Sequence, residues 1–394
     1  MRSSRILFLI ATLNPECGGP IEALRQLVDY YQTNGVAAEI LCLDAPDAIW
    51  LRDYRVPVVA LGPSYGVYAL NFKLLPWLRR NRGRYDFFVV RGLWQFIGLA
   101  VRLALAGTST PYFVFPHGML DPWFKHRYPL KHLKKCFYWL LVEYWVLRNA
   151  RAVIFTSEEE RAAAGDTFRP YRCRQAVVSY GTAPAPADAD FYRSLFYSQF
   201  PHLRSKRILL FLSRIHEKKG CDLLLRAYAE AVGADSDAHL LIAGPGSGDY
   251  MAQLRRLAEE LGLEQAVTWM GMARGDMKWA AFHAAEIFIL PSHQENFGVA
   301  VAESLACSTP VLISDKVNIW REVTSAGAGL VDSDSVAGAR RLLGSWLALS
   351  EAEYAAMARN ASACFGKYFH IQAAATHLLA ILLAPPVPAS KRRY

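Results

Sequence analysis

Two carboxylates stand on either side of the expected start of a helix at residues 299–307. Glu295 lies in the loop that follows an apolar strand expected at residues 287–290, and Glu303 follows eight residues later. Gly298 between them lets a ligand approach the backbone closely, and the first amides of a helix attract anions. Carboxylates repel a bare phosphate but accept hydrogen bonds from hydroxyls. The pattern therefore favours a ligand with both phosphates and hydroxyls, such as a nucleotide sugar; the alternative is a helix whose acids only face solvent.

A basic pair, Arg214 and Lys219, follows another expected strand at residues 208–213. Arginine offers a planar fork of donors and lysine a compact ammonium, so together they can neutralise a diphosphate leaving group without a metal ion. Taken alone, the pair also fits an ordinary basic turn. Beside the carboxylate loop, we interpret it as a phosphate-binding pair.

His117 and Gly118 directly follow a strand expected at residues 112–115. Imidazole at the carboxyl end of a strand can bond a sugar or a developing charge, because its protonation is tunable near neutral pH. Asp121 is the nearest acid and a candidate for the acceptor side. A histidine with a purely structural role is the alternative.

Glycines follow two further strands. Gly18 and Gly19 come after the first strand, but they do not form a GxGxxG pattern, which disfavours a dinucleotide dehydrogenase. The loop that begins at Gly244 either lines the nucleotide pocket or forms a plain turn.

The elements that position these residues alternate in the manner of doubly wound α/β domains. Strands at residues 6–10 and 37–43 enclose a helix at residues 21–34, and such βαβ units build parallel sheets covered on both faces. Further strands are expected at residues 56–61, 87–90, 112–115, 153–156 and 176–179, then at 208–213, 239–243, 267–270, 287–290 and 311–314, with helices at 221–232 and 250–261. The small, proline-rich run at residues 181–187 is typical of a linker. Open parallel sheets bind ligands beyond the carboxyl ends of their strands, where the residues above lie.

Composition supports two folded domains. The chain has 394 residues, 53% hydrophobic and 20% charged, enough to bury two cores. Residues 1–180 hold 23 basic and 14 acidic side chains, whereas residues 181–394 hold 21 of each. The one-sided excess suits anionic lipid or a phosphorylated substrate, or is ordinary solvated surface. The chain has no recognised nucleic-acid module, so no nucleic-acid partner is expected.

A basic stretch at residues 125–135 precedes an aromatic one that ends at Trp145. Cations beside aromatics are typical of a surface that rests on anionic headgroups or holds a pyrophosphate-linked lipid, and equally of an amphipathic core helix with a basic flank. Both interpretations stay open.

Seven dispersed cysteines indicate a reducing cytosol, and neither they nor the histidines have metal-ligand spacing. Residues 1–12 look like a signal peptide but are interpreted as a strand. The apolar segment at residues 371–384 is too short to span a bilayer.

At Arg214 and Lys219, and at Glu295 and Glu303 with its E-x7-E spacing, the chain resembles the retaining GT-B glycosyltransferases of family four. The resemblance covers nearly the whole chain. His117 to Trp123 looks like a subgroup common in bacterial exopolysaccharide and lipopolysaccharide assembly.

The resemblance implies two Rossmann-like domains that face a central cleft: an acceptor-binding domain at residues 1–182, a linker at 183–204 and a nucleotide-sugar-binding domain at 205–365. Residues 366–394 would form a last helix that packs back on the first domain, with a basic tail.

The resemblance also implies roles. Glu303 would bind the donor ribose, Glu295 the sugar hydroxyls, Arg214 and Lys219 the diphosphate, and His117 the sugar near the reacting carbon. The residues expected at the donor are Gly19, Arg214, Lys219, Gly244, Asn296, Phe297, Gly298 and Glu303, and those expected in catalysis are His117, Arg214, Lys219 and Glu295.

The expected activity is metal-independent, retaining sugar transfer from a nucleotide sugar to a glycan or polyprenyl-pyrophosphate-linked acceptor in cell-surface polysaccharide biosynthesis. The enzyme would need no cofactor. It would be cytoplasmic, and peripheral attachment to the inner face of the plasma membrane is a further expectation. The alternatives are a non-catalytic GT-B scaffold of a polysaccharide assembly complex, a sugar-nucleotide epimerase, or a phosphorylase, for which no lysine is placed to hold pyridoxal phosphate.

Overall fold

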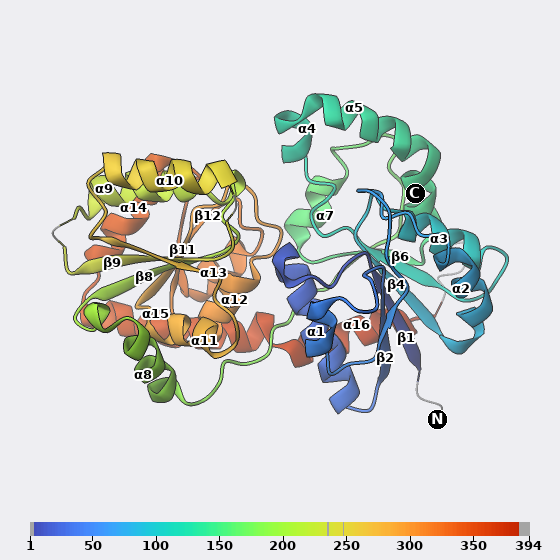
Figure 1. The fold of residues 1–394 in the computed structure, drawn as a ribbon, viewed down its shortest axis with the longest axis horizontal. Coiled ribbons are helices and arrows are strands. Elements are labelled where there is room, and N and C mark those ends of the chain that lie inside the picture. The colour runs from blue at the N-terminus through green and yellow to red at the C-terminus, as the bar shows by residue number, and fades with distance from the viewer. Residues whose placement is uncertain (1–3, 235, 247, 386–394) are drawn as a thin grey trace. The chain divides into compact units, whose positions relative to one another are not determined.

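The computed structural model describes residues 4–234, 236–246 and 248–385. It divides into two compact units (Figure 1). The first runs to Gly181 and takes up the chain again from Ile371, and the second comprises Thr182–His370.

Within the described residues, the first unit contains a parallel sheet of seven strands in the order β3-β2-β1-β4-β5-β6-β7. Its strands are β1 (Arg5–Ile10), β2 (Ala37–Cys42), β3 (Val58–Ala60), β4 (Phe87–Arg91), β5 (Tyr112–Phe115), β6 (Ala152–Phe155) and β7 (Gln175–Val177). Its helices are α1 (Gly19–Thr33), α2 (Leu74–Asn81), α3 (Phe96–Leu105), α4 (Trp123–Arg127), α5 (Pro129–Tyr138), α6 (Tyr144–Asn149), α7 (Glu158–Ala164) and α16 (Ile371–Leu383).

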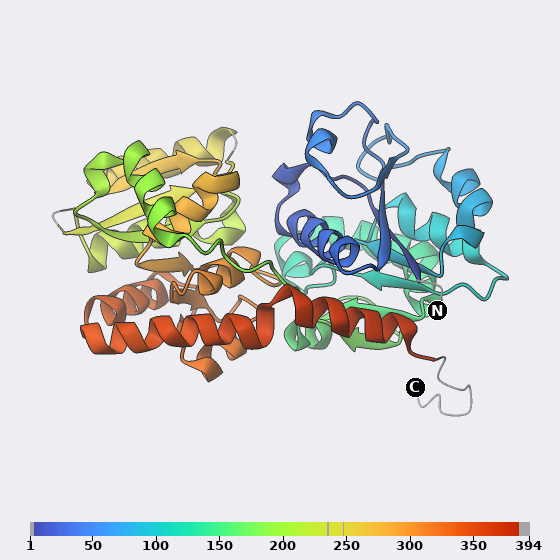
Figure 2. The same cartoon turned by 90° about the horizontal axis from the view of Figure 1, so that it is seen from below.

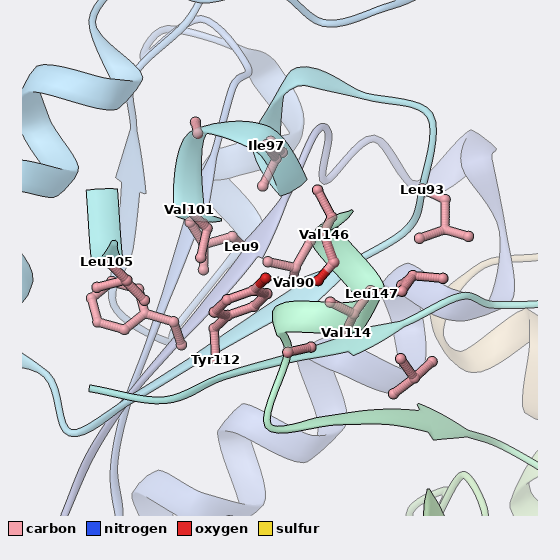
Figure 3. Packing of buried hydrophobic residues seen from close by; sticks show 14 of the residues in the cluster. Leu9, Val90, Leu93, Ile97, Val101, Leu105, Tyr112, Val114, Val146 and Leu147 are labelled. Atoms are coloured by element: carbon pink, nitrogen blue, oxygen red, sulfur yellow. Dashed lines mark hydrogen bonds between the residues drawn. The ribbon is translucent and has the colours of Figure 1, made fainter. Parts of the chain in front are cut away.

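Both faces of this sheet are buried, which explains why its central strands are continuous apolar runs. Successive side chains of β1 point to opposite faces: Leu7 and Leu9 pack in one core, Phe8 and Ile10 in the other. Figure 3 shows the first of these cores, where side chains from β4 and β5 meet α3 and α6.

The second unit is also doubly wound. Over the residues that the structure describes, its parallel sheet has six strands in the order β10-β9-β8-β11-β12-β13. They are β8 (Arg207–Leu212), β9 (Ala238–Ala243), β10 (Val267–Gly271), β11 (Ile287–Leu290), β12 (Val311–Ser314) and β13 (Gly329–Asp332). Its helices are α8 (Ala189–Gln199), α9 (Cys221–Ala231), α10 (Gly248–Glu260), α11 (Gly275–Ala284), α12 (Val299–Ala306), α13 (Trp320–Ala326), α14 (Val336–Leu347) and α15 (Glu351–Cys364).

The prediction of a linker at residues 183–204 is wrong for half of that range, because α8 lies within it. The Asp188 side chain caps this helix by accepting a hydrogen bond from the Phe191 amide at 2.9 Å. Helix α8 then packs on α11, where the Tyr192 ring stacks on His283 with centroids 5.6 Å apart. The segment is therefore part of the second unit.

The last described helix, α16, returns to the first unit, and the basic tail predicted after it lies outside the described residues. A π-helical turn, Phe365–Phe369, separates α15 from α16, and α16 lies beside α1 (Figures 1 and 2). Ala375 and Leu378 enter the core, and the Tyr31 hydroxyl donates to the Ala375 carbonyl at 2.8 Å. In the described part of the chain, no helix combines the length and apolarity needed to cross a bilayer.

Candidate functional site

The loops after β8 and β11 touch at Gly220. This residue has a φ of +68°, and a Cβ there would lie 2.3 Å from the Pro291 carbonyl oxygen, so only glycine fits. The Lys218 carbonyl accepts hydrogen bonds from the Ser292 hydroxyl at 3.0 Å and the His293 amide at 2.8 Å. The basic loop and the carboxylate loop are thus one fixed surface at the carboxyl edge of the sheet.

Glu295 is fixed from its other side as well. Its amide donates to the Lys316 carbonyl at 3.0 Å, and its carbonyl accepts from the Asn318 amide at 3.0 Å. This short bridge beyond the end of β12 sets the direction in which the Glu295 side chain leaves the backbone.

Lys219 and Glu295 form a largely buried ion pair, with 5% and 20% of their side chains exposed. Lys219 is only 4% exposed, and its Nζ donates to the Glu295 carboxylate. Burial alone would raise the pKa of Glu295, but Lys219, then Lys218 and Arg214, outweigh it, so the pKa lies below its ordinary value. Glu295 is therefore ionised at neutral pH, while Arg214 exposes its side chain nearby. The structure brings these three predicted residues together.

A second buried pair joins Glu303 to Lys278. Glu303 is 3% exposed, and the Lys278 Nζ donates to its Oε1 at 2.7 Å. A buried carboxylate needs such a partner, because an unpaired charge in the interior is costly. Lys278 comes from α11, and the sequence analysis missed it, since nothing in the pattern of that helix relates it to Glu303.

Helix α12 begins between the two acids. Its N-cap, Gly298, has a φ of +83°, a left-handed conformation that favours glycine. Asn296 is half-buried in the same loop. Phe297 is 2% exposed and packs edge-on against Phe369, with centroids 5.6 Å apart. Its side chain is thus part of the core, so only its backbone is placed to meet a ligand.

Gly244 has a structural task. With a φ of +141°, it lies so close to β8 that a Cβ would fall 1.7 Å from the Ser213 carbonyl oxygen. Its amide donates to the Gly271 carbonyl at 2.7 Å. The amide is therefore used within the sheet edge, and a role of Gly244 at a nucleotide stays a prediction.

In the first unit, His117 lies just beyond β5 with a φ of +53°. The Tyr180 hydroxyl contacts its Nδ1 and lies 3.3 Å from its Nε2. Arg91, at the end of β4, donates from Nη2 to the Tyr180 oxygen at 3.0 Å. The tyrosine oxygen accepts from Arg91, and in its hydrogen bond with Nδ1 the tautomer of the imidazole decides which of the two groups donates.

The charge state of His117 follows from the same cluster. Burial first, and then the positive charge of Arg91, lower the pKa of His117 well below its usual value. The imidazole is therefore neutral at neutral pH. Arg91 and Tyr180 escaped the sequence analysis, although a charged residue that ends an apolar strand was a visible signal for Arg91.

Glu160 holds the turn that carries His117. Its carboxylate accepts from the Gly118 amide at 2.6 Å and from the Thr156 amide at 2.7 Å. The nearby Asp121 accepts from the Trp123 amide at 2.8 Å at the start of α4. Glu160 was also missed, since only the fold brings α7 to this turn.

Gly19 is the first residue of α1, after the N-cap Gly18 with a φ of +92°. Gly19 and His117 belong to the first unit, whereas the other predicted site residues belong to the second. Across the described ranges, no three His, Cys, Asp or Glu side chains gather as a metal-binding group.

Two family models match the chain, one in each of its two parts. Residues 18–181 match the family "Glycosyl transferase 4-like domain", and residues 197–363 match "Glycosyl transferases group 1". A D-inositol 3-phosphate glycosyltransferase from Mycolicibacterium smegmatis is 33% identical over 176 residues, which cover 43% of this chain and 39% of that protein. The matched segments span less than two fifths of the length of the curated relatives.

Two solved structures show the same fold over almost the whole chain. HepE from Anabaena, in complex with UDP and glucose, has a TM-score of 0.77 at 19% identity and covers 96% of this chain and 99% of its own. WaaG, a glycosyltransferase involved in lipopolysaccharide biosynthesis, has a TM-score of 0.68 at 15% identity and covers 96% and 100%. The chain therefore has the GT-B fold, and it matches a glycosyl transferase 4-like domain in its first part and a glycosyl transferases group 1 domain in its second.

Proposed function

We propose that this protein transfers a sugar from a nucleotide-sugar donor to an acceptor, with retention of anomeric configuration. The observation that carries the proposal is the pair of buried carboxylate–ammonium contacts, Lys219 with Glu295 and Lys278 with Glu303, beside the exposed Arg214. Acids that accept from hydroxyls and cations that neutralise phosphates lie side by side, as a nucleotide sugar requires.

Each residue has a distinct task in this proposal. Glu303 binds the ribose and Glu295 the sugar hydroxyls. Lys219 turns from Glu295 toward the diphosphate as it binds, and Arg214 adds a second cation. These charges stabilise the diphosphate as it leaves, and such electrostatic stabilisation is usually the largest catalytic contribution. The two cations take the place that a divalent metal would otherwise fill.

His117 acts near the reacting carbon in this proposal. A neutral imidazole donates a hydrogen bond without adding a positive charge, so it can position a sugar oxygen without opposing an oxocarbenium-like transition state. The leaving phosphate takes the acceptor's proton.

We further propose an acceptor that is a glycan or a polyprenyl-pyrophosphate-linked sugar of cell-surface polysaccharide biosynthesis. The resemblance of residues 117–123 and the fold shared with WaaG support this choice. A polyprenyl-linked acceptor would be held at the inner face of the plasma membrane, so we propose a cytoplasmic location there.

The test is donor binding by titration calorimetry, without metal, across UDP, GDP, ADP and TDP sugars. UDP-glucose is the first choice, because HepE was also solved with it. We expect Arg214→Ala and Glu295→Gln each to weaken binding by about ten- to a hundredfold, the worth of a charge-assisted hydrogen bond. The matched controls Arg256→Ala and Glu259→Gln, exposed on α10, should leave binding unchanged.

The same assay separates the alternatives. Binding with slow donor hydrolysis, insensitive to chelator, fits a transferase, and proton NMR of the released sugar then reports retention or inversion. Interconversion of two nucleotide sugars would instead indicate an epimerase. If no nucleotide sugar binds, the transferase proposal fails and a non-catalytic scaffold becomes the better interpretation.

A further inference from the structure

An apolar stripe runs along the solvent side of the segment at residues 129–149. Helix α5, a π-helical turn (Trp139–Glu143) and α6 follow one another there without a break. The exposed apolar side chains recur every three or four residues and therefore share one face; they are Leu130, Leu133, Phe137, Leu140, Leu141 and Trp145. Leu130 is 80% exposed and Phe137 70%.

The orientation of this face is fixed by the opposite side of the segment. Trp139, Val146 and Leu147 are buried in the core shared with α3, part of which Figure 3 shows. The indole Nε1 of Trp139 also donates to the Pro170 carbonyl at 2.9 Å. The segment cannot rotate to hide its stripe without unpacking that core, so the stripe is a built surface.

Basic side chains flank the stripe within its own segment of the chain. Between Asp121 and Glu158 the sequence has seven lysines and arginines and a single acid, Glu143, which is buried. Lys131 and Lys134 are exposed on α5. Arg148 lies over the Trp145 ring, 5.5 Å from its centroid, so positive charge reaches both ends of the stripe.

We infer that this face docks on the surface of an anionic lipid bilayer. Leucine, phenylalanine and tryptophan between lysines are the composition of a helix that lies in the headgroup region, apolar face toward the acyl chains. Lysines near the surface add attraction to anionic lipids. A second copy of this chain would present the same positive charge, which disfavours self-association through this face.

The proposal goes beyond the transfer reaction, and its test needs no nucleotide sugar. The protein is sedimented with vesicles of phosphatidylcholine alone, or with vesicles that also contain about 30% of the anionic lipid phosphatidylglycerol. Both kinds of vesicle are tested at low and at high salt. We expect binding to the anionic vesicles that high salt weakens.

Three variants locate the contact. Leu133→Glu and Phe137→Glu should each weaken binding at least tenfold, because each replaces an apolar side chain that the bilayer would bury with a charged one. Lys131→Glu with Lys134→Glu should weaken it by about fivefold or more per lysine. The matched controls are Ile49→Glu, an exposed apolar residue elsewhere in the first unit, and the pair Arg79→Glu with Arg80→Glu on α2.

Brominated lipids give a second readout, since bromine quenches tryptophans that reach the acyl region. Quenching should fall in Trp145→Phe, and circular dichroism should show that every variant keeps its fold. Absence of binding to anionic vesicles, or binding that the stripe and lysine variants leave intact, overturns the inference. Dimerisation lost in Leu133→Glu without vesicle binding would assign the face to self-association and overturn it as well.

Discussion

Replacing Lys219 by methionine tests how much the Lys219–Glu295 ion pair contributes to the stability of the fold and how much to donor binding. Methionine keeps the length and apolar stem of lysine but removes the charge, which leaves the Glu295 carboxylate without its ammonium partner. Loss of one partner of a buried pair costs about 3–5 kcal/mol, unless the remaining group takes up a proton.

Protonation sets an upper limit to this cost. From the ordinary pKa of 4.5, protonating Glu295 costs about 1.4 kcal/mol for each pH unit above it. The free energy of unfolding of Lys219→Met should therefore fall by at most about 3.4 kcal/mol at pH 7 and by about 0.7 kcal/mol at pH 5.

The sign follows from linkage. In the wild type the pKa of Glu295 is lowered, so its stabilising contribution is present above the unfolded pKa and is lost as the pH falls through the folded value. In the variant burial raises that pKa, so the folded state loses stability as the pH rises. The gap between the two proteins should thus widen from pH 5 to pH 7.

Urea unfolding followed by circular dichroism at both pH values measures the gap. Lys316→Met removes a half-exposed lysine paired with Asp315 at 3.0 Å, and it should cost less than about 1 kcal/mol at either pH. The double variant Lys219→Met with Glu295→Gln should recover much of the stability but not donor binding. An equal cost of Lys219→Met at pH 5 and pH 7 would refute the electrostatic account and assign the loss to packing.

Three further outcomes are expected. Gly220→Ala should lower the free energy of unfolding in urea by more than about 2 kcal/mol, because a Cβ there meets the carbonyl of the carboxylate loop. The control Gly233→Ala has a similarly positive φ but open space around it, so it should cost only about 1–2 kcal/mol. Equal losses in the two variants would contradict this explanation. Lys278→Met should weaken nucleotide binding in calorimetry by about tenfold or more, because it removes the ammonium that donates to the Glu303 carboxylate, and unchanged affinity would remove Glu303 from the donor site. Tyr180→Phe should lower kcat more than it raises KM, and nitrogen NMR should show the ring hydrogen spread over both imidazole nitrogens; a single unchanged tautomer would refute the hydrogen-bond chain.

Much of the fold could be predicted because the sheets are buried on both faces. The strands Tyr112–Phe115, Ile287–Leu290 and Val311–Ser314 have the predicted bounds, since each is a continuous apolar run between turn residues. β13 was not predicted, because Gly329–Asp332 is partly exposed and weakly apolar. Helix α8 was taken for linker on the strength of the prolines before it, although Asp188 was a local signal for its start.

The site residues that directly follow a strand could be predicted from the sequence. The residues that only tertiary contacts bring to the site could not. Glu295 and Lys219 stand at the carboxyl ends of neighbouring strands, so topology alone brings them to one edge. Lys278, Tyr180 and Glu160 come from segments whose local patterns have no link to the residues they hold. Only the folded chain relates them.

The return of α16 to the first unit also affects the order in which the protein can be completed on the ribosome. The hydrogen bond from the Tyr31 hydroxyl can form only after Ala375 has been synthesised, 344 residues later. Ile371, Leu378 and Leu382 belong to the same core. Domains usually fold in the order in which they emerge. Here the second unit can be complete before α16 supplies its part of the first unit's core, so the domain that is synthesised first is completed last.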